Sequence, residues 1–210
     1  MSGIEMMTGP NTPAAARLSF RHYLAAPLAL VLAGCISFGA EPPESLLTLT
    51  SEATAPVGTA VAITPENTIA VFEPSAPARL DVTRVPVQVD SNSIAYLKEA
   101  LWVERPARLF RRLLSETLRA RGDTNILGED DVGLVATSIV RGSLVDFGYD
   151  APSRSVIVRF DAVYSRGEGT PQTRRFESIV PNIEPEAAPV GVALNQAAND
   201  VARQVAAWIG

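Results

Sequence analysis

One segment in the last third of the sequence has apolar residues at alternate positions, and a short turn-like stretch separates it from a second extended segment. In residues 153–165, four alternate positions are apolar: Val156, Val158, Phe160 and Ala162. The positions between them hold Ile157, Arg159 and Asp161. Alternate side chains of a strand point to opposite faces, so this pattern predicts a strand with one buried face. The stretch RGEGTP, residues 166–171, predicts a hairpin turn, and residues 172–180 the returning strand. The chain must therefore build a sheet with one face covered by other elements.

The elements that cover this face are predicted to be two helices. Residues 106–121 have apolar residues at spacings of three and four, which is typical of one buried helix face. These residues are Leu109, Phe110, Leu113, Leu114 and Leu118. Pro106 suits the first helical turn, and Gly122 follows as a stop signal. After a proline-rich break, residues 190–209 repeat the helical spacing and predict the second helix.

Shorter apolar and β-branched runs predict further strands. Before the first helix they lie at residues 45–53, 59–64, 68–74, 84–90 and, as a short strand, 94–97. Residues 132–150 predict a long strand that is punctuated by glycines. The order is therefore strands, helix, antiparallel strands and helix. We expect an α+β fold with a mixed, largely antiparallel sheet and both helices packed on one face.

The N-terminal region has the composition of a targeting segment. Residues 23–33 form an apolar run that follows the basic residues Arg17 and Arg21. A helix of this length rises only about 16 Å, which is too short to span a bilayer. A basic flank, a short apolar run and small residues at its end are typical of a secretory signal peptide. We predict that residues 1–34 are this signal peptide.

The only cysteine of the chain stands at the end of this segment. The residues there are Leu32, Ala33, Gly34 and Cys35. They resemble a bacterial lipobox, in which a peptidase cuts before a cysteine that carries a diacylglycerol. We expect Cys35 to carry a covalent diacylglycerol and an N-acyl chain, which together anchor a protein stably. Residues 35–45 would then be the lipidated cysteine and a flexible tether, and residues 46–210 a single domain. The alternative is an ordinary cysteine in a cleaved or hydrophobic leader.

The composition excludes several classes of catalytic site. The one histidine, His22, lies in the predicted signal peptide, so the mature part lacks imidazole and free thiol groups. Ser-His-Asp and Cys-His nucleophiles and most zinc or iron sites need these groups. The aspartates Asp146, Asp150 and Asp161 match no calcium-loop spacing, and we expect them to be solvated. We predict no enzyme, no metal site and no cofactor. The formal net charge of −5 also argues against a nucleic-acid partner.

The arginines of the first predicted helix and the two aromatic residues before it could each have either a structural role or a binding role. Arginines lie between the apolar residues of the first predicted helix: Arg108, Arg111, Arg112 and Arg119. A contact to a partner or to lipid phosphates is one interpretation, and a solvated helix face is the favoured one. Tyr96 and Trp102 precede this helix. We expect them to close the core over the sheet, and partner recognition is the alternative.

Residues 85–118, VPVQVDSNSIAYLKEALWVERPARLFRRLLSETL, resemble the ABC-type transport auxiliary lipoprotein family. The positions that match the family pattern are Ile94, Tyr96, Trp102, Pro106, Leu109, Leu113 and Leu118. The resemblance makes Tyr96, Trp102 and Pro106 candidates for partner binding or for the core of the motif. The chain departs from the family at Leu46 and Leu47, where a tyrosine pair is common. If the tyrosines of the family contact a partner, that contact is in doubt for this chain. If they belong to the core, leucine is an acceptable replacement.

The resemblance implies a lipid-anchored, non-catalytic accessory on the periplasmic face of the outer membrane. Ile36 agrees with that location, because lipoproteins kept in the inner membrane of proteobacteria usually have aspartate there. Proteins of this family work with an inner-membrane ABC permease and ATPase and with a periplasmic mammalian-cell-entry (MCE) protein. That system moves lipids or other hydrophobic compounds between the two membranes. Its energy comes from the ATPase, because this chain has no Walker A sequence. The sequence leaves the oligomeric state undecided, and a homo-oligomer is possible. The alternative function is that of a structural lipoprotein that supports outer-membrane or secretion-complex assembly.

Overall fold

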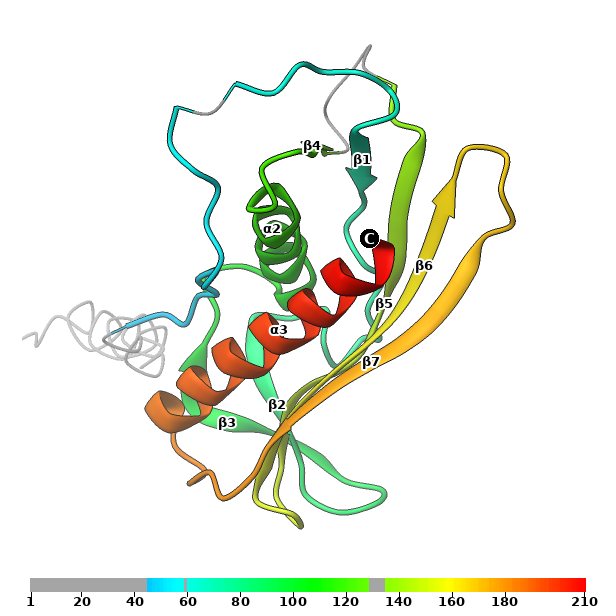
Figure 1. Ribbon diagram of the computed structural model, residues 1–210. Coiled ribbons are helices and arrows are strands. Elements are labelled where there is room, and N and C mark those ends of the chain that lie inside the picture. Colours follow the sequence, from blue (N-terminus) through cyan, green and yellow to red (C-terminus); the bar gives the residue numbers. More distant parts are fainter. Residues whose placement is uncertain (1–44, 59, 129–134) are drawn as a thin grey trace, which may run out of the picture. The chain divides into compact units, whose positions relative to one another are not determined.

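The computed structural model describes residues 45–58, 60–128 and 135–210. Within these residues the chain forms a seven-stranded sheet and two helices, which belong to one compact unit (Figure 1). The strands are β1 (Thr68–Val71), β2 (Arg84–Gln88), β3 (Ile94–Leu101), β4 (Asn125–Leu127), β5 (Ser138–Asp150), β6 (Ser155–Arg166) and β7 (Gln172–Val180). The helices are α2 (Pro106–Arg119) and α3 (Ala187–Ile209). The predicted α+β class is confirmed.

The sheet is organised around β5. On one side β5 pairs with β6 along its whole length, and β6 pairs in turn with β7, both in antiparallel orientation. On its other side β5 is shared, because its first residues pair in parallel with β1 and its last residues with β2. β4 extends the sheet next to β1 in parallel, and β3 extends it next to β2 in antiparallel orientation. The sheet is therefore mixed, and its longest ladders are antiparallel.

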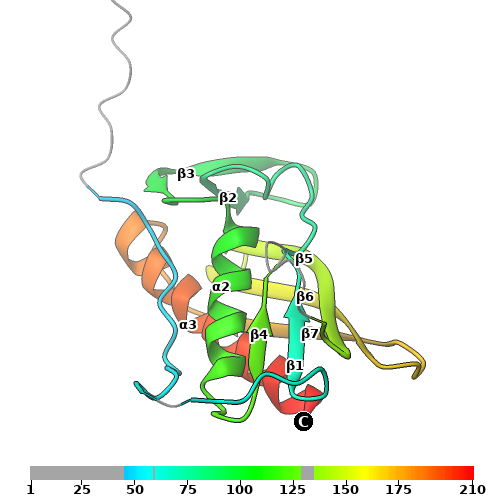
Figure 2. The ribbon, with the colours of Figure 1, turned by 90° about the horizontal axis from the view of Figure 1, so that it is seen from above.

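Both helices pack on the same face of the sheet. The ring of Phe110 in α2 lies 5.1 Å from that of Phe160 in β6, and Trp208 of α3 lies 5.5 Å from Phe176 in β7. Phe160 and Phe176 are directly opposite in the β6–β7 ladder, so their side chains share one face. The two helices also contact each other (Figure 2). The prediction of two helices on one face is confirmed, and we call the opposite side the helix-free face.

The alternation in β6 explains which face is buried. Val156, Val158, Phe160 and Ala162 are at most 1% exposed. The apolar residues of α2 complete this core from the helix side, since Leu109, Phe110, Leu113, Leu114 and Leu118 are all buried. Complete burial of one large apolar side chain of this kind stabilises the fold by about 1.5–3 kcal/mol.

The boundaries of several elements differ from the predicted ones. The helix predicted over 106–121 ends at Arg119, and the one predicted over 190–209 begins at Ala187. The short strand predicted at 94–97 continues to Leu101. Glu99 in this extension has a left-handed backbone (φ 59°), and the pairing with β2 is irregular between Tyr96 and Leu101, so a regular alternation does not run through these residues. β5 begins at Ser138, and residues 132–134 of the predicted long strand lie outside the described residues. The hairpin turn between β6 and β7 lies where the sequence predicted it.

Two predicted strands were wrong. The described residues of 59–64 form no strand, and neither does 45–53, where Leu47 makes one isolated bridge with Trp102. The N–H of Leu47 donates to the carbonyl of Leu101 at 2.7 Å, and its carbonyl accepts from the N–H of Val103 at 2.9 Å. Beyond that bridge, the backbone of this segment bonds to side chains of the helices instead of a neighbouring strand.

We call residues 46–55 the N-terminal strap, because three helix side chains hold its backbone. The N–H of Thr50 donates to Oδ1 of Asn195 at 2.8 Å. Asn199 accepts from the N–H of Glu52 and donates to the carbonyl of Thr50, both at 2.9 Å. The N–H of Ala55 donates to Oε1 of Glu116 in α2, also at 2.9 Å. The strap is thus fastened to both helices.

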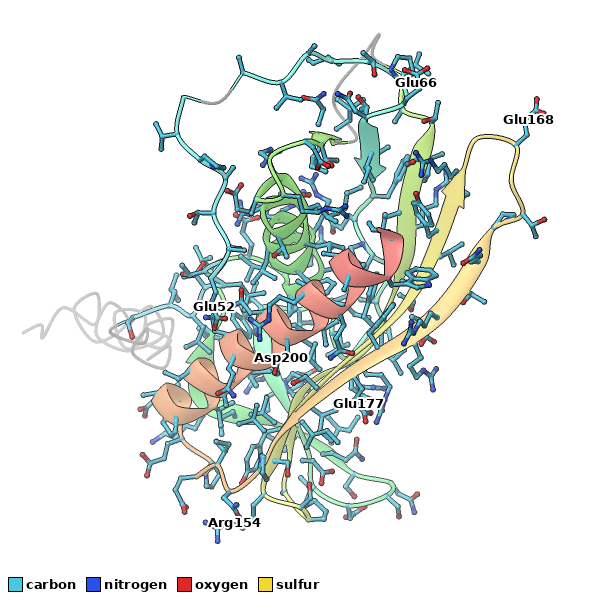
Figure 3. The ribbon with its side chains drawn as sticks, in the orientation of Figure 1. Glu52, Glu66, Arg154, Glu168, Glu177 and Asp200 are labelled. Carbon is cyan, nitrogen blue, oxygen red and sulfur yellow. The ribbon has the colours of Figure 1, made fainter. Side chains whose placement is uncertain are left out.

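Side chains of the strap reinforce this attachment. Leu47 lies so close to α3 that a Cβ atom at Gly191 would stand 2.6 Å from its Cδ2. Glu52 lies beside α3, on which Asp200 is found (Figure 3). Arg203 of α3 pairs with both carboxylates, and its distance to Glu52 is 2.6 Å. The glycine therefore permits the close approach that begins the strap.

Candidate functional site

Two of the three candidate residues for partner binding or for the core of the motif, Trp102 and Pro106, are buried. Trp102 is 2% exposed, and its ring packs edge-on against Phe147 of β5 with centroids 5.6 Å apart. Its indole N–H has no hydrogen-bond partner among the residues that the structure describes. Pro106 is buried in the first turn of α2, where a residue without an N–H is tolerated. Both residues fix the start of α2 against the sheet.

Tyr96 lies in different surroundings. The β2–β3 ladder places it opposite Pro86, and the next pair on the same face joins Gln88 with Ile94. These residues belong to the helix-free face. The half-buried ring of Tyr96 lies under the guanidinium of Arg84, whose Cζ is 4.6 Å from the ring centroid, in a cation–π contact. Of the two aromatic residues that match the family pattern, Tyr96 is therefore the one that reaches the surface.

A cavity of about 290 Å³ opens on the helix-free face. Its walls come from β2, β3, β5 and β6 and from the segment that joins β1 to β2. Apolar walls come from Pro86, Ile94 and Ile157, and polar ones from Arg79, Gln88, Asp146, Asp150 and Arg159. Gly148 allows the close packing beside the cavity, because a Cβ atom there would lie 2.5 Å from the carbonyl oxygen of Pro86. We call this hollow the sheet-face cavity.

An arginine–carboxylate network forms the charged side of the sheet-face cavity. Arg79 and Arg159 share Asp146, and the Arg79–Asp146 distance is 2.7 Å. Arg159 also donates from Nε to Oε2 of Glu177 at 2.6 Å. Arg79 additionally donates to the carbonyl of Val145. Because the arginines are matched by carboxylates within the network, the cavity offers an occupant apolar surface and shape more than net charge.

The three aspartates that could suggest a metal site are engaged elsewhere. Asp146 belongs to the network, and Asp150 accepts from the N–H of Ser153 at 3.0 Å. Asp161 accepts two hydrogen bonds from Arg175, at 2.6 and 2.7 Å. These bonds lower the pKa of the Asp161 carboxyl below its usual value. Within the described ranges, no group of three potential metal-ligating side chains occurs.

The part of the chain that the structure describes contains neither histidine nor cysteine, since His22 and Cys35 lie outside it. The rest of the lipobox, Leu32, Ala33 and Gly34, also lies outside the described residues. Among the residues described, no helix has both the length and the apolar composition needed to cross a membrane.

The sequence missed the charged network for a physical reason. Arg79 lies between β1 and β2 in a segment without a period, so no pattern connects it to Asp146, which is distant along the chain. The sequence of the β6–β7 hairpin did contain enough information to predict part of the network. Once its turn is placed, the register sets Arg159 opposite Glu177 and Asp161 opposite Arg175. Opposite charges at directly facing positions predict cross-strand ion pairs.

The fold resembles solved structures of low sequence identity. A crystal structure of protein XCC0632 from Xanthomonas campestris has a TM-score of 0.65 at 15% identity, over 78% of this chain and 94% of that chain. The crystal structure of an uncharacterized protein has a TM-score of 0.59 at 13% identity, over 79% of this chain and 100% of that one. At these identities the likeness establishes the fold alone. No curated protein matches the sequence significantly.

A family of sequences matches the chain much more specifically. The model of the ABC-type transport auxiliary lipoprotein component covers residues 47–206. That range begins in the strap, includes the whole described sheet and α2, and ends near the end of α3. It contains Tyr96, Trp102 and Pro106, which carried the resemblance in the sequence. Because the match spans most of the chain, the protein belongs to the family of ABC-type transport auxiliary lipoprotein components.

Proposed function

We propose that this lipoprotein is a non-catalytic accessory of an MCE/ABC-type system that moves lipids or other hydrophobic compounds between the inner and outer membranes. Acyl chains on Cys35 anchor it to the periplasmic face of the outer membrane. There it docks the periplasmic MCE protein, while the inner-membrane permease and ATPase drive transport. The observation that carries the proposal is the family match over residues 47–206.

The position of the strap in the sequence supports a folded domain that stays close to the membrane that holds the anchor. Its first fixed contacts are those of Leu47, so about ten residues separate Cys35 from the folded domain. Ten residues reach at most about 33–36 Å when fully extended. The partner must therefore come close to the membrane that holds the anchor, which suits a conduit that delivers material there.

The charges of the described domain support a role in binding. Asp146, Asp161 and Glu177 are all held by arginines. A carboxylate that acts as a general acid or base needs access to a substrate proton and a pKa near the working pH. The pKa of Asp161 instead lies below its ordinary range.

In-cell crosslinking followed by purification of the lipoprotein tests the proposed partner. A photo-reactive residue at Ile94 places the probe on the helix-free face, where this side chain is 45% exposed. The matched control places it at Val192 on α3, which is 72% exposed. We expect an MCE protein to be recovered from position 94 in excess over position 192. Recovery of an outer-membrane or secretion assembly complex, with no MCE protein or permease from either position or by general crosslinking, would contradict the proposal.

Two substitutions test the anchor. Cys35→Ser removes the acceptor thiol, so we expect no incorporation of a fatty-acid probe and accumulation of the precursor. Ile36→Asp keeps the thiol, so the protein should still be labelled but move to the inner-membrane fraction. Label that persists in Cys35→Ser would contradict the assignment of Cys35, and unchanged fractionation of Ile36→Asp would contradict the sorting argument.

A further inference from the structure

A second hollow, of about 720 Å³, lies between the N-terminal strap and α2. We call it the strap groove. Its principal residues are Thr50 and Ser51 of the strap and Arg111, Ser115, Glu116 and Arg119 of α2. Arg111, Ser115 and Arg119 are spaced by four residues and therefore lie on one side of the helix. The groove thus presents a row of hydrogen-bond donors on a rigid element.

The hydroxyl group of Ser115 has no hydrogen-bond partner among the residues that the structure describes. The residue is 7% exposed, and its Oγ makes no hydrogen bond within the part of the chain described. A buried hydroxyl without a partner costs about 1–3 kcal/mol relative to a satisfied one. Thr117, two residues later, shows the usual solution, because its hydroxyl donates to the carbonyl of Leu113 at 2.9 Å. The hydroxyl of Ser115 forms no such bond to a backbone carbonyl among the described residues, so it can donate a hydrogen bond to a ligand in the groove.

Arg111 lies one turn before Ser115 in α2. Its side chain is half-buried, and it has no ion pair among the described residues. The other arginines of the groove differ, since Arg112 lies 2.8 Å from Glu104 and Arg119 lies 3.0 Å from Glu116. A guanidinium has five N–H donors, so Arg119 keeps donors free after its contact with Glu116.

The remaining groups of the groove favour an anion. Glu116 is the carboxylate in the groove lining, and both of its oxygens are occupied, Oε1 by the N–H of Ala55 and Oε2 by Arg119. Its charge is therefore offset, whereas Arg111 has no carboxylate partner among the described residues. Arginine forks match the oxygens of a phosphate group in two parallel hydrogen bonds. Leu49 and Ile126 add apolar wall next to the charged row.

We propose that the strap groove binds a phosphate group, which accepts hydrogen bonds from the guanidinium of Arg111 and the hydroxyl of Ser115, with Arg119 at its far side. The phosphate can belong to a free ion or to an anionic lipid headgroup, because both present the same oxygens. This inference goes beyond the transport role and depends only on the groove. It gives the arginines of α2 a binding function, where the sequence alone favoured a solvated helix face.

Phosphorus NMR on the purified lipidated protein in neutral detergent tests the site. One arm titrates the protein into inorganic phosphate, and the other into dihexanoylphosphatidylglycerol. Line broadening in the first arm alone identifies a free phosphate as the ligand. Broadening of the lipid signal that inorganic phosphate reverses identifies a headgroup. Broadening in neither arm overturns the proposal.

Three variants make the result specific. Arg111→Gln should weaken binding tenfold or more, because a charge-assisted hydrogen bond is lost. Arg108→Gln is the matched control, since Arg108 lies on the same helix but pairs with Glu73 and Glu104 outside the groove. Ser115→Ala should weaken binding about threefold or more without lowering Tm, because the unpartnered hydroxyl is removed. Equal affinities of Arg111→Gln, Ser115→Ala and the unchanged protein would refute the assignment.

Discussion

The attachment of the N-terminal strap gives the sharpest test of the structure. Asn199 is 2% exposed, and its amide forms two hydrogen bonds to the strap backbone, with the N–H of Glu52 and the carbonyl of Thr50. Asn199→Ala removes both bonds. Each is worth about 1 kcal/mol net, and alanine returns roughly 0.5 kcal/mol through its higher helix propensity. With the small void left behind, we expect the free energy of unfolding to fall by about 2 kcal/mol.

Amide hydrogen exchange distinguishes loss of these two bonds from release of the whole strap. The N–H of Thr50 and that of Ala55 bond to Asn195 and Glu116, which the substitution leaves in place. If the strap opens as one unit, exchange at both amides should rise by roughly thirtyfold, which corresponds to about 2 kcal/mol. Urea unfolding supplies the global value.

Asn195→Ala is the matched control for this experiment. It removes one exposed hydrogen bond to the strap, so its cost should be about 0.5–1 kcal/mol. The reasoning is refuted if Asn199→Ala costs no more than Asn195→Ala and exchange at Ala55 stays unchanged. In that case the contact of Leu47 with α3, and not the asparagine amides, would hold the strap.

Two further predictions concern the sheet. Gly148→Ala places a Cβ atom 2.5 Å from the backbone carbonyl oxygen of Pro86, so β2 must move, and urea unfolding should show a loss of about 1–3 kcal/mol; an unchanged midpoint would contradict the close packing. Arg175→Gln removes the bonds that lower the pKa of Asp161, so carbon NMR titration should show that pKa rising toward its ordinary value. Because the folded-state pKa is depressed, this pair stabilises the fold above the ordinary carboxyl pKa, and the contribution disappears as the pH falls through the folded value; equal titration of Asp161 in both proteins would contradict the pairing.

The elements that the sequence predicted well are those whose pattern is complete within a few residues. Alternation predicted the buried face of β6, and the glycine- and proline-containing stretch at residues 166–171 predicted the position of the β6–β7 turn. The spacing of Leu109, Leu113 and Leu118 likewise fixed the buried side of α2. In each case the residues that decide the structure are neighbours along the chain, so periodicity contains the information.

The strap and the two hollows could not be predicted in this way. The strap has an apolar, β-branched sequence typical of a strand, but its backbone bonds to Asn195 and Asn199, which lie about 145 residues away. The sheet-face cavity depends on Arg79, which stands in an irregular segment. For the strap groove, the sequence did show the arginines of α2. Which of them lacks a carboxylate partner became visible only when Glu104 and Glu116 were placed.

The way in which the strap is held has a consequence for how the family can diverge. The helices hold it at Thr50, Glu52 and Ala55 by backbone N–H and carbonyl groups, which every residue other than proline provides equally. At these three points the attachment does not depend on the side chains of the strap, and its specificity comes from Asn195, Asn199 and Glu116 of the helices. Leu47 and Glu52 add side-chain contacts to α3. Sequence drift should accumulate in the strap and be resisted at those three helix positions. Leu46, which is exposed, is free to change in this way, whereas Leu47 is constrained by its side-chain contact with Gly191.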